Sequence, residues 1–190
     1  MASPTTLTPA QAAARTDELT VIDVRAPGEY ASGHLPGAHN IPLDRLDEAV
    51  DTLQDVAARQ ELLVVCASGA RSERACTQLA SHGVTAATLT GGTSAWAAEG
   101  RDLDQPAGAK ATWPMERQVR LAAGSLVVAG LLAGRRYPAA RWLSAGIGSG
   151  LVFSGVTNTC GMATVLSKLP HNQPAKGAPE LPDTLKRLRG

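Results

Sequence analysis

The most informative segment of the chain reads Leu63-Val64-Val65-Cys66-Ala67-Ser68-Gly69-Ala70-Arg71-Ser72-Glu73-Arg74. An apolar, β-branched run is followed by small residues and then by residues suited to the first turn of a helix. The segment predicts a strand that ends at Cys66, a short loop, and a helix capped by Ser72. This order of elements is typical of an α/β domain.

The sequence on either side of this segment favours the same fold class. Residues 19–24 and 61–66 are apolar enough to be strands buried on both faces of a parallel sheet, and 86–89 is a weaker third strand. Apolar residues recur at helical spacing over 43–53 and 72–82. We therefore expect a parallel sheet flanked by helices.

Composition divides the chain into differently built parts. Residues 1–100 mix charged and apolar runs, whereas 119–169 contain very few charges. We expect an α/β domain over 1–102, a linker over 103–116, an apolar pair of helices over 117–169 and a polar tail over 170–190. The N-terminal 20 residues lack the pattern of a signal peptide, so we expect the first domain to stay in the cytoplasm.

Charge and cysteine spacing exclude some classes of function. A formal net charge of +1 gives no basic excess for nucleic-acid binding. Cys66, Cys76 and Cys160 lie far apart and form no metal-ligand spacing, which favours free thiols in a reducing compartment. We expect neither a metal nor a cofactor.

The loop after Cys66 has the properties of an anion-binding site. Small residues let the backbone curl so that N–H groups converge on one point, next to the positive end of a helix dipole. The same amides and Arg71 would stabilise a Cys66 thiolate, so that Cys66 could act as a nucleophile without a dedicated base. We therefore predict Cys66 as the catalytic residue. The predicted substrate-binding residues are Ala67, Ser68, Gly69, Ala70, Arg71 and Ser72.

Three ordered motifs support a family resemblance. The run from Cys66 to Ser72 resembles the C-x-x-G-x-R-S loop of single-domain rhodaneses. Residues 21–30, VIDVRAPGEY, and 33–42, GHLPGAHNIP, are similar to the N-terminal signature of that family. Gly91-Gly92 with Trp96 and Gly100 is similar to its closing motif.

The resemblance implies a rhodanese fold and a sulfurtransferase. Cys66 would take the outer sulfur of thiosulfate or of a persulfide, release sulfite or a thiol, and pass the sulfur to a small thiol or cyanide. Arg71 would orient the donor's sulfonate. A phosphatase or arsenate-handling enzyme could use the same loop, but related phosphatases place five residues between Cys and Arg, and here there are four. A redox-sensing or sulfur-carrier module without turnover is the other alternative.

Several residues near the motifs have simpler interpretations. Asp23, Arg25 and Glu29 favour a salt-bridged support over an acid/base cluster. Cys76 shares a helix side with apolar residues and is expected to be a packed thiol. His34 and His39 lie in turn-rich sequence without further ligands. The Gly91-Gly92 pair is expected to form a turn before the last helix of the domain.

The C-terminal part predicts a membrane hairpin. Residues 121–134 and 142–167 carry no charge, with an arginine-rich turn at 135–138 between them. Gly130/Gly134 and Gly146/Gly150 form G-x-x-x-G pairs, which allow close helix packing in lipid. The alternative is an apolar hairpin buried in a soluble dimer.

A second resemblance concerns this hairpin. Residues 115–124, MERQVRLAAG, and 155–163, GVTNTCGMA, resemble the two-helix tail of bacterial inner-membrane rhodaneses. This implies a transmembrane hairpin in the inner membrane, with lipid as a partner, a possible homodimer through the hairpin, and the rhodanese domain facing the cytoplasm. Cys160 would then be a packed thiol within the membrane.

Overall fold

A computed structural model of the chain describes residues 4–105, 112–157, 161–173 and 180–189. The chain forms two compact units. The first consists of Met1–Thr112 together with Pro174–Gly190, and the second of Trp113–Gln173.

The first unit contains a parallel sheet of five strands. They are β1 (Thr6–Leu7), β2 (Leu19–Asp23), β3 (His39–Asn40), β4 (Glu61–Val65) and β5 (Ala86–Leu89), in the order β1-β5-β4-β2-β3. All paired strands run parallel. The predicted parallel sheet is confirmed, and the two-residue edge strands β1 and β3 complete it.

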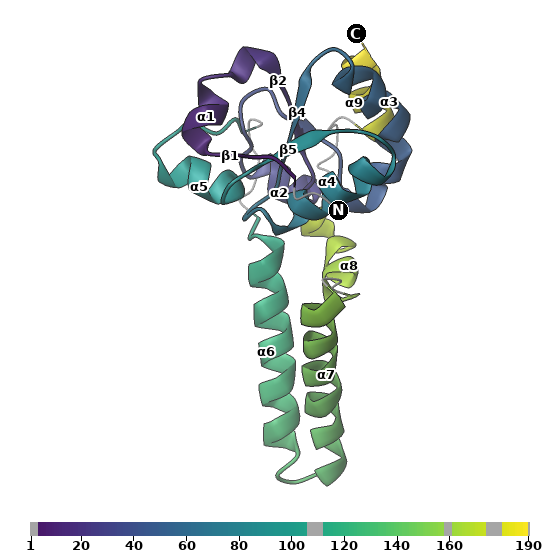
Figure 1. The fold of residues 1–190 in the computed structure, drawn as a ribbon. Helices are drawn as coiled ribbons and strands as arrows, with labels where there is room; N and C mark the ends of the chain where they lie inside the picture. The colour runs from purple at the N-terminus through teal and green to yellow at the C-terminus, as the bar shows by residue number, and fades with distance from the viewer. Residues whose placement is uncertain (1–3, 106–111, 158–160, 174–179, 190) are drawn as a thin grey trace. The chain divides into compact units, whose positions relative to one another are not determined.

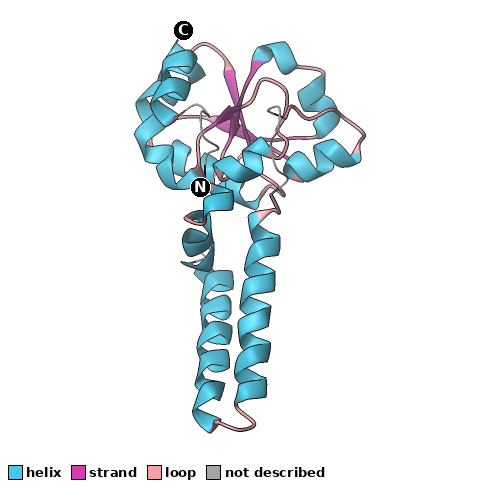
Figure 2. Ribbon diagram, turned by 180° about the vertical axis from the view of Figure 1, so that it is seen from behind, coloured by secondary structure: helices cyan, strands magenta, loops and turns pink. Residues whose placement is uncertain are grey.

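Helices cover both faces of the sheet (Figures 1 and 2). They are α1 (Pro9–Ala13), α2 (Pro27–Ala31), α3 (Val50–Ala57), α4 (Ala70–Ser81), α5 (Gly92–Ala98) and α9 (Leu181–Arg189). Short 3-10 helices span Thr16–Glu18 (η1) and Leu43–Ala49 (η2). The apolar run over 43–53 is therefore a 3-10 helix that leads into α3.

Alternate residues of the central strands face two separate cores. Ile22 and Val64 pack in one core with residues of α3, α4 and α9. Val21 and Leu63 pack in the other core with residues of α1 and with Trp96 of α5. Period-two alternation in a strand that is buried on both faces explains why these segments read as continuous apolar runs.

The polar tail contributes a helix to the first unit. Leu181 and Leu188 of α9 are buried in the core that contains α3. Arg59 donates to the Leu188 carbonyl at 3.2 Å, and Arg189 donates to Thr52 Oγ1 at 3.0 Å. Residues that follow the apolar part of the sequence thus return to the α/β core.

The second unit is helical. It contains α6 (Met115–Ala133), η3 (Pro138–Ala140), α7 (Arg141–Thr157), α8 (Gly161–Ser167) and η4 (Pro170–Asn172). Helices α6 and α7 run side by side (Figure 1), and Ser144 donates to the Val127 carbonyl at 2.9 Å. A Cβ on Gly130 would lie 2.4 Å from Ser144 Oγ, so Gly130 allows this close approach. For Gly146 and Gly150, no other part of the described chain lies within 4 Å of such an atom.

A polar cluster joins the start of α6 to the end of the second unit. The amides of Gln118 and Asn172 exchange two hydrogen bonds of 2.9 Å, and His171 Nε2 lies 3.0 Å from Gln118 Oε1. Gln118 and Asn172 are buried. The start of α6 is thereby tied to the segment after α8.

The transmembrane hairpin is not confirmed. The uncharged run over 142–167 does not form one helix, because α7 ends at Thr157 and α8 begins at Gly161. Within the described ranges, none of the helices combines the length and the apolar character needed to cross a bilayer. Cys160 lies outside the described residues.

Candidate active site

Cys66 lies directly after the carboxyl end of β4 and is fully buried. The Gly69 N–H donates to Cys66 Sγ at 3.1 Å, and the Ser72 hydroxyl oxygen lies 3.7 Å from the same sulfur. Gly69 has φ +110°, a conformation that glycine adopts at little cost. The curled loop predicted from the small residues therefore brings a backbone donor to the thiol.

The other predicted loop residues lie around this contact. Ala67 is buried and its carbonyl accepts a hydrogen bond from the Ser94 amide at 3.1 Å. Ser68 and Ala70 are exposed, so they form the outer side of the loop. Helix α4 begins at Ala70, which places the amino end of the helix beside the sulfur. This is the helix position expected for an anion site.

Ser72 has a different role from the one expected. It lies inside the first turn of α4, and Gly69 is the capping position, so the predicted cap at Ser72 is wrong. The buried Ser72 hydroxyl donates to the Gly69 carbonyl at 2.8 Å and also bonds Thr88 Oγ1 of β5. The side chain therefore fixes the loop from the inside, because it contacts the sulfur, the loop and the sheet together.

Backbone amides at the start of α5 bind the backbone of the loop that contains Cys66. The Thr93 amide donates to the Cys66 carbonyl at 2.8 Å, next to the Ser94 bond to Ala67. Gly91 and Gly92 both have positive φ, +70° and +60°. Gly91 lies in the predicted turn and is the capping residue of α5, and Gly92 is the first residue of that helix. The closing motif of the sequence is thus part of the active-site support.

Arg71 forms an ion pair with Glu29 of α2. Its two terminal nitrogens donate to the two carboxylate oxygens at 2.8 and 2.9 Å. The Glu29 side chain is 2% exposed and that of Arg71 is 17% exposed. The Ala26 amide also donates to Glu29, at 3.3 Å. Glu29 therefore holds the arginine that the sequence predicted as a donor ligand.

A second buried ion pair joins Asp23 and Arg25. Arg25 donates to both Asp23 oxygens, with a shortest distance of 2.6 Å, and to the Gly33 carbonyl at 2.7 Å. Asn40 donates to the carbonyls of Asp23 and Arg25, each at 2.9 Å. The predicted salt-bridged support is confirmed for Asp23, Arg25 and Glu29.

His34 and His39 of the N-terminal motif lie among packed residues of the first unit. The His34 ring stacks on Tyr30 with 3.7 Å between centroids, and its backbone pairs with Asp104. Burial raises the pKa of Tyr30 to about 12, with a further contribution from the Asp23 charge. Burial, together with the positive charge of Arg187, lowers the pKa of His39. The backbone pairing of His34 with Asp104 also shows that residue 104, which the sequence analysis assigned to the linker, packs with the first unit.

Cys76 is a packed thiol, as expected. It is buried on α4, and its sulfur lies 3.6 Å from the Ala87 carbonyl. Burial raises the pKa of Cys76 to about 12, and the nearby Glu73 charge adds to this effect. A neutral thiol of this kind is a poor nucleophile.

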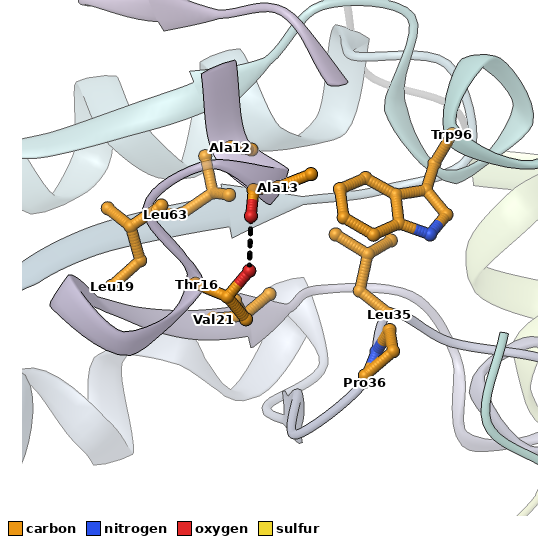
Figure 3. Close-up of a pocket in the computed structure, with 9 residues that line it drawn as sticks. All are labelled: Ala12, Ala13, Thr16, Leu19, Val21, Leu35, Pro36, Leu63 and Trp96. Carbon is orange, nitrogen blue, oxygen red and sulfur yellow. Dashed lines mark hydrogen bonds between the residues drawn. The ribbon is translucent and has the colours of Figure 1, made fainter. Parts of the chain in front are cut away.

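An apolar pocket lies elsewhere in the first unit (Figure 3). Its volume is about 220 Å³, and it is lined by Ala12, Ala13, Thr16, Leu19, Val21, Leu35, Pro36, Leu63 and Trp96. Thr16, the one lining residue with a polar side-chain oxygen, donates to the Ala13 carbonyl at 2.9 Å. The lining contains no acidic, basic or thiol side chain, so this pocket is not a candidate reactive centre.

Comparisons with known proteins agree with this geometry. Residues 8–99 match the family described as rhodanese-like domain, and 114–175 match the family described as inner membrane protein YgaP-like, transmembrane domain. A crystal structure of a Bacillus halodurans protein has the same fold, with a TM-score of 0.50 and 23% identity. The match covers 61% of this chain and 88% of that one.

Alignments of this chain with two relatives cover most of the length of each relative. A protein of Synechocystis sp. named as uncharacterized is 38% identical over 159 residues, which are 83% of this chain and 86% of that protein. A sulfurtransferase of Allochromatium vinosum is 31% identical over 99 residues, 52% of this chain and 90% of that protein. With the motif around Cys66 in place, the chain belongs to the rhodanese family, and carries after its rhodanese-like domain a segment similar to the YgaP-like transmembrane domain.

Proposed function

We propose that the chain is a sulfurtransferase that carries sulfane sulfur as a persulfide on Cys66. The observation that carries the proposal is the Gly69 N–H, which donates to Cys66 Sγ at 3.1 Å where β4 ends and α4 begins. A backbone donor and a helix amino end stabilise negative charge on sulfur without any proton acceptor. A thiolate in this position is suited to attack a sulfur electrophile.

The transfer consists of two displacements at sulfur. The Cys66 thiolate attacks the outer sulfur of thiosulfate, the S–S bond breaks, and sulfite leaves with the bonding electrons. A persulfide donor releases a thiolate in the same way. An acceptor thiolate, or cyanide, then attacks the outer sulfur of the Cys66 persulfide and regenerates the Cys66 thiolate. Each step conserves charge and needs no external oxidant.

Mass spectrometry of the intact chain tests this proposal. After incubation with thiosulfate, the chain should gain one sulfur atom, and added thiol should remove it. Cys66→Ser should abolish the gain, whereas Cys76→Ser, the matched buried thiol, should keep it. Absence of any gain in the wild type would refute the proposal, and turnover of an aryl phosphate instead would favour a phosphatase.

We further propose that residues 113–173 hold the protein at the bacterial inner membrane, with the rhodanese domain on the cytoplasmic side. In the described part of the chain, the large apolar side chains that are exposed all lie between Trp113 and Leu169. Trp142 is 80% exposed and Val156 is 82% exposed. An exposed apolar surface of this extent calls for lipid or a partner. The match to the inner-membrane family supports lipid.

The packing of α9 supports a segment that enters and leaves the membrane on the same side. Residues on both sides of the second unit belong to the same compact first unit. Both ends of residues 113–173 must therefore lie on one side of any membrane that this segment enters. This agrees with a hairpin anchor, and the protease experiment below tests on which side the rhodanese domain lies.

Fractionation of cells that produce the full chain tests the membrane proposal. The protein should sediment with membranes, resist an alkaline wash and dissolve in detergent. Val156→Asp should weaken membrane retention, whereas Gln54→Asp, an exposed change in the first unit, should not. Protease added outside spheroplasts should spare the rhodanese domain. A chain found in the soluble fraction as a dimer would contradict the proposal and favour a hairpin buried between two copies.

A further inference from the structure

The Ser72 hydroxyl lies at the centre of three hydrogen bonds beside the Cys66 sulfur. It donates its proton to the Gly69 carbonyl at 2.8 Å. Its oxygen accepts from the Cys66 thiol, with 3.7 Å between sulfur and oxygen, and also bonds Thr88 Oγ1 of β5. Cys66 and Ser72 are 0% exposed and Thr88 is 2% exposed, so these contacts lie out of reach of bulk water.

A count of protons shows which hydroxyl donates in the contact between Ser72 and Thr88. Each hydroxyl has one proton, and that of Ser72 is used on the Gly69 carbonyl. Over the ranges that the structure describes, Ser72 Oγ is the one hydrogen-bond partner of Thr88 Oγ1. A buried hydroxyl proton without an acceptor is costly, so Thr88 donates to Ser72.

Loss of the Cys66 proton changes the bonds of the Ser72 hydroxyl. A thiolate accepts hydrogen bonds but donates none, so the bond from Cys66 to Ser72 Oγ disappears and the Ser72 proton can turn to the sulfur. The Gly69 carbonyl keeps its bond from the Glu73 amide at 2.9 Å, so this turn leaves no buried acceptor unpaired. Among the described residues, Thr88 then remains as the donor to Ser72 Oγ.

We propose that Thr88 is a positioning residue for sulfur transfer, because its hydroxyl holds Ser72 in place to donate to Cys66 Sγ whenever that sulfur carries negative charge. The bond from Thr88 also polarises the Ser72 hydroxyl and makes it a stronger donor. Thr88 acts through Ser72 and does not itself contact the sulfur. The inference rests on the proposed sulfur transfer at Cys66 and adds a residue of the neighbouring strand to its site.

The discharge of the persulfide is the step in which this support matters most. An acceptor thiolate R–S⁻ attacks the outer sulfur of Cys66–S–SH, the S–S bond breaks, and R–S–SH forms. The electron pair of the broken bond goes to Cys66 Sγ, so the negative charge passes from the acceptor to that sulfur and atoms and charge balance. A hydroxyl that donates to Sγ therefore stabilises the leaving group.

The first test measures discharge on the full-length chain. The protein is loaded with thiosulfate, and the loss of the added sulfur to 2-mercaptoethanol is followed by mass spectrometry. Thr88→Val keeps the shape of the side chain but removes the hydroxyl, and it should slow discharge by about fivefold. Thr88→Ser keeps the hydroxyl and should stay within about twofold of the wild type.

The pH midpoint for alkylation of Cys66 by iodoacetamide gives a second measurement that needs no sulfur transfer. Thr88→Val should raise this midpoint by about 0.7 pH unit. The reason is that Ser72 Oγ still accepts from the thiol form of Cys66 but has no remaining donor in the thiolate form. Strand β5 and helix α5 contain no titratable side chain. The charged and titratable side chains of α4, which are the same in every variant, are Arg71, Glu73, Arg74 and Cys76.

Two controls separate this role from a general loss of packing. Thr52→Val removes another buried hydroxyl, which accepts from Arg189 at 3.0 Å on the side of α3, and it should leave both measurements unchanged. In a Ser72→Ala background, Thr88→Val should have no further effect, because the hydroxyl through which Thr88 acts is absent. An undiminished effect in that background would overturn the inference.

The remaining outcomes distinguish the role of Thr88 from the proposed function. Thr88→Ala also lacks the hydroxyl and takes the place of Thr88→Val if that variant does not fold. An unchanged discharge rate or an unchanged pH midpoint in the variant without the hydroxyl overturns the role of Thr88 alone. If the wild type takes up no sulfur, the proposed function fails, and the pH midpoint still decides whether Thr88 acts on Cys66.

Discussion

A Cβ atom on Gly92 would lie 2.2 Å from the carbonyl oxygen of Cys66. The first residue of α5 is therefore in direct contact with the backbone of Cys66, the proposed nucleophile, and its φ of +60° also disfavours a side chain. Gly92→Ala must displace the loop. We expect a loss of about 2–4 kcal/mol in the free energy of unfolding and at least about tenfold slower loading of Cys66. Urea unfolding and mass spectrometry measure the two effects.

Gly83→Ala is the matched control for this change. Gly83 has φ +76°, but no other part of the described chain lies within 4 Å of a Cβ at this position. The substitution should cost about 1–2 kcal/mol through the backbone alone and leave loading unchanged. Equal effects of the two variants on loading would show that contact with Cys66 is not the reason for Gly92.

Cys76 should be chemically silent while Cys66 reacts. With a pKa of about 12, the Cys76 thiol is ionised in roughly one molecule in a thousand at pH ~9. Alkylation of the folded chain should therefore modify Cys66 long before Cys76, as peptide mapping would show. Rapid labelling of Cys76 in the folded state would be inconsistent with the raised pKa of its thiol.

The contact between α6 and α7 depends on Gly130. Its added Cβ would meet Ser144 Oγ at 2.4 Å, and Ser144 is the residue that bonds the Val127 carbonyl. Gly130→Val should separate the helices and lower the midpoint of thermal unfolding of the purified chain in detergent. Gly146→Val is the control, because no other part of the described chain surrounds that position within 4 Å. A larger effect at Gly146 would mean that its face of α7 is covered by another molecule.

The sequence predicted those parts of the fold that depend on local patterns. The loop from Cys66 to Arg71 was recognisable because small residues between a strand and a helix have few other uses. The buried strands β2 and β4 were recognisable as apolar runs. The pairing of Glu29 with Arg71 was only partly foreseen, since no local pattern specifies which of several charges will meet.

Other elements could not be read from the sequence for physical reasons. The edge strands β1 and β3 are two residues long, too short for any period to appear. Helix α9 follows a long apolar segment. Its apolar residues pack against α3, which precedes α9 by more than a hundred residues, so no local pattern indicates this contact. The break between α7 and α8 lies in a run without charge, so composition gave no sign of it.

Substitution of Leu188 tests how much α9 contributes to the stability of the first unit. It is 8% exposed and packs with the core residues of α3. Leu188→Ala should lower the free energy of unfolding of the rhodanese domain by about 2–3 kcal/mol. Lys186→Ala, on the exposed side of the same helix, should change it by less than about 0.5 kcal/mol. Equal and small effects would show that the domain does not need this helix.

His39 should make the stability of the domain depend on pH. Burial and the charge of Arg187 lower its pKa in the folded state below the ordinary value of 6.5. The unfolded chain therefore binds a proton more readily, so the contribution of His39 to stability is complete above about pH 6.5 and is lost as the pH falls through the lowered folded pKa. Urea unfolding between about pH 8 and about pH 5 should show this loss in the wild type and a smaller loss in His39→Gln. Arg187→Gln should give an intermediate result, because it removes the lesser of the two causes. Parallel pH profiles for the wild type and His39→Gln would show that the ring keeps its ordinary pKa in the folded protein.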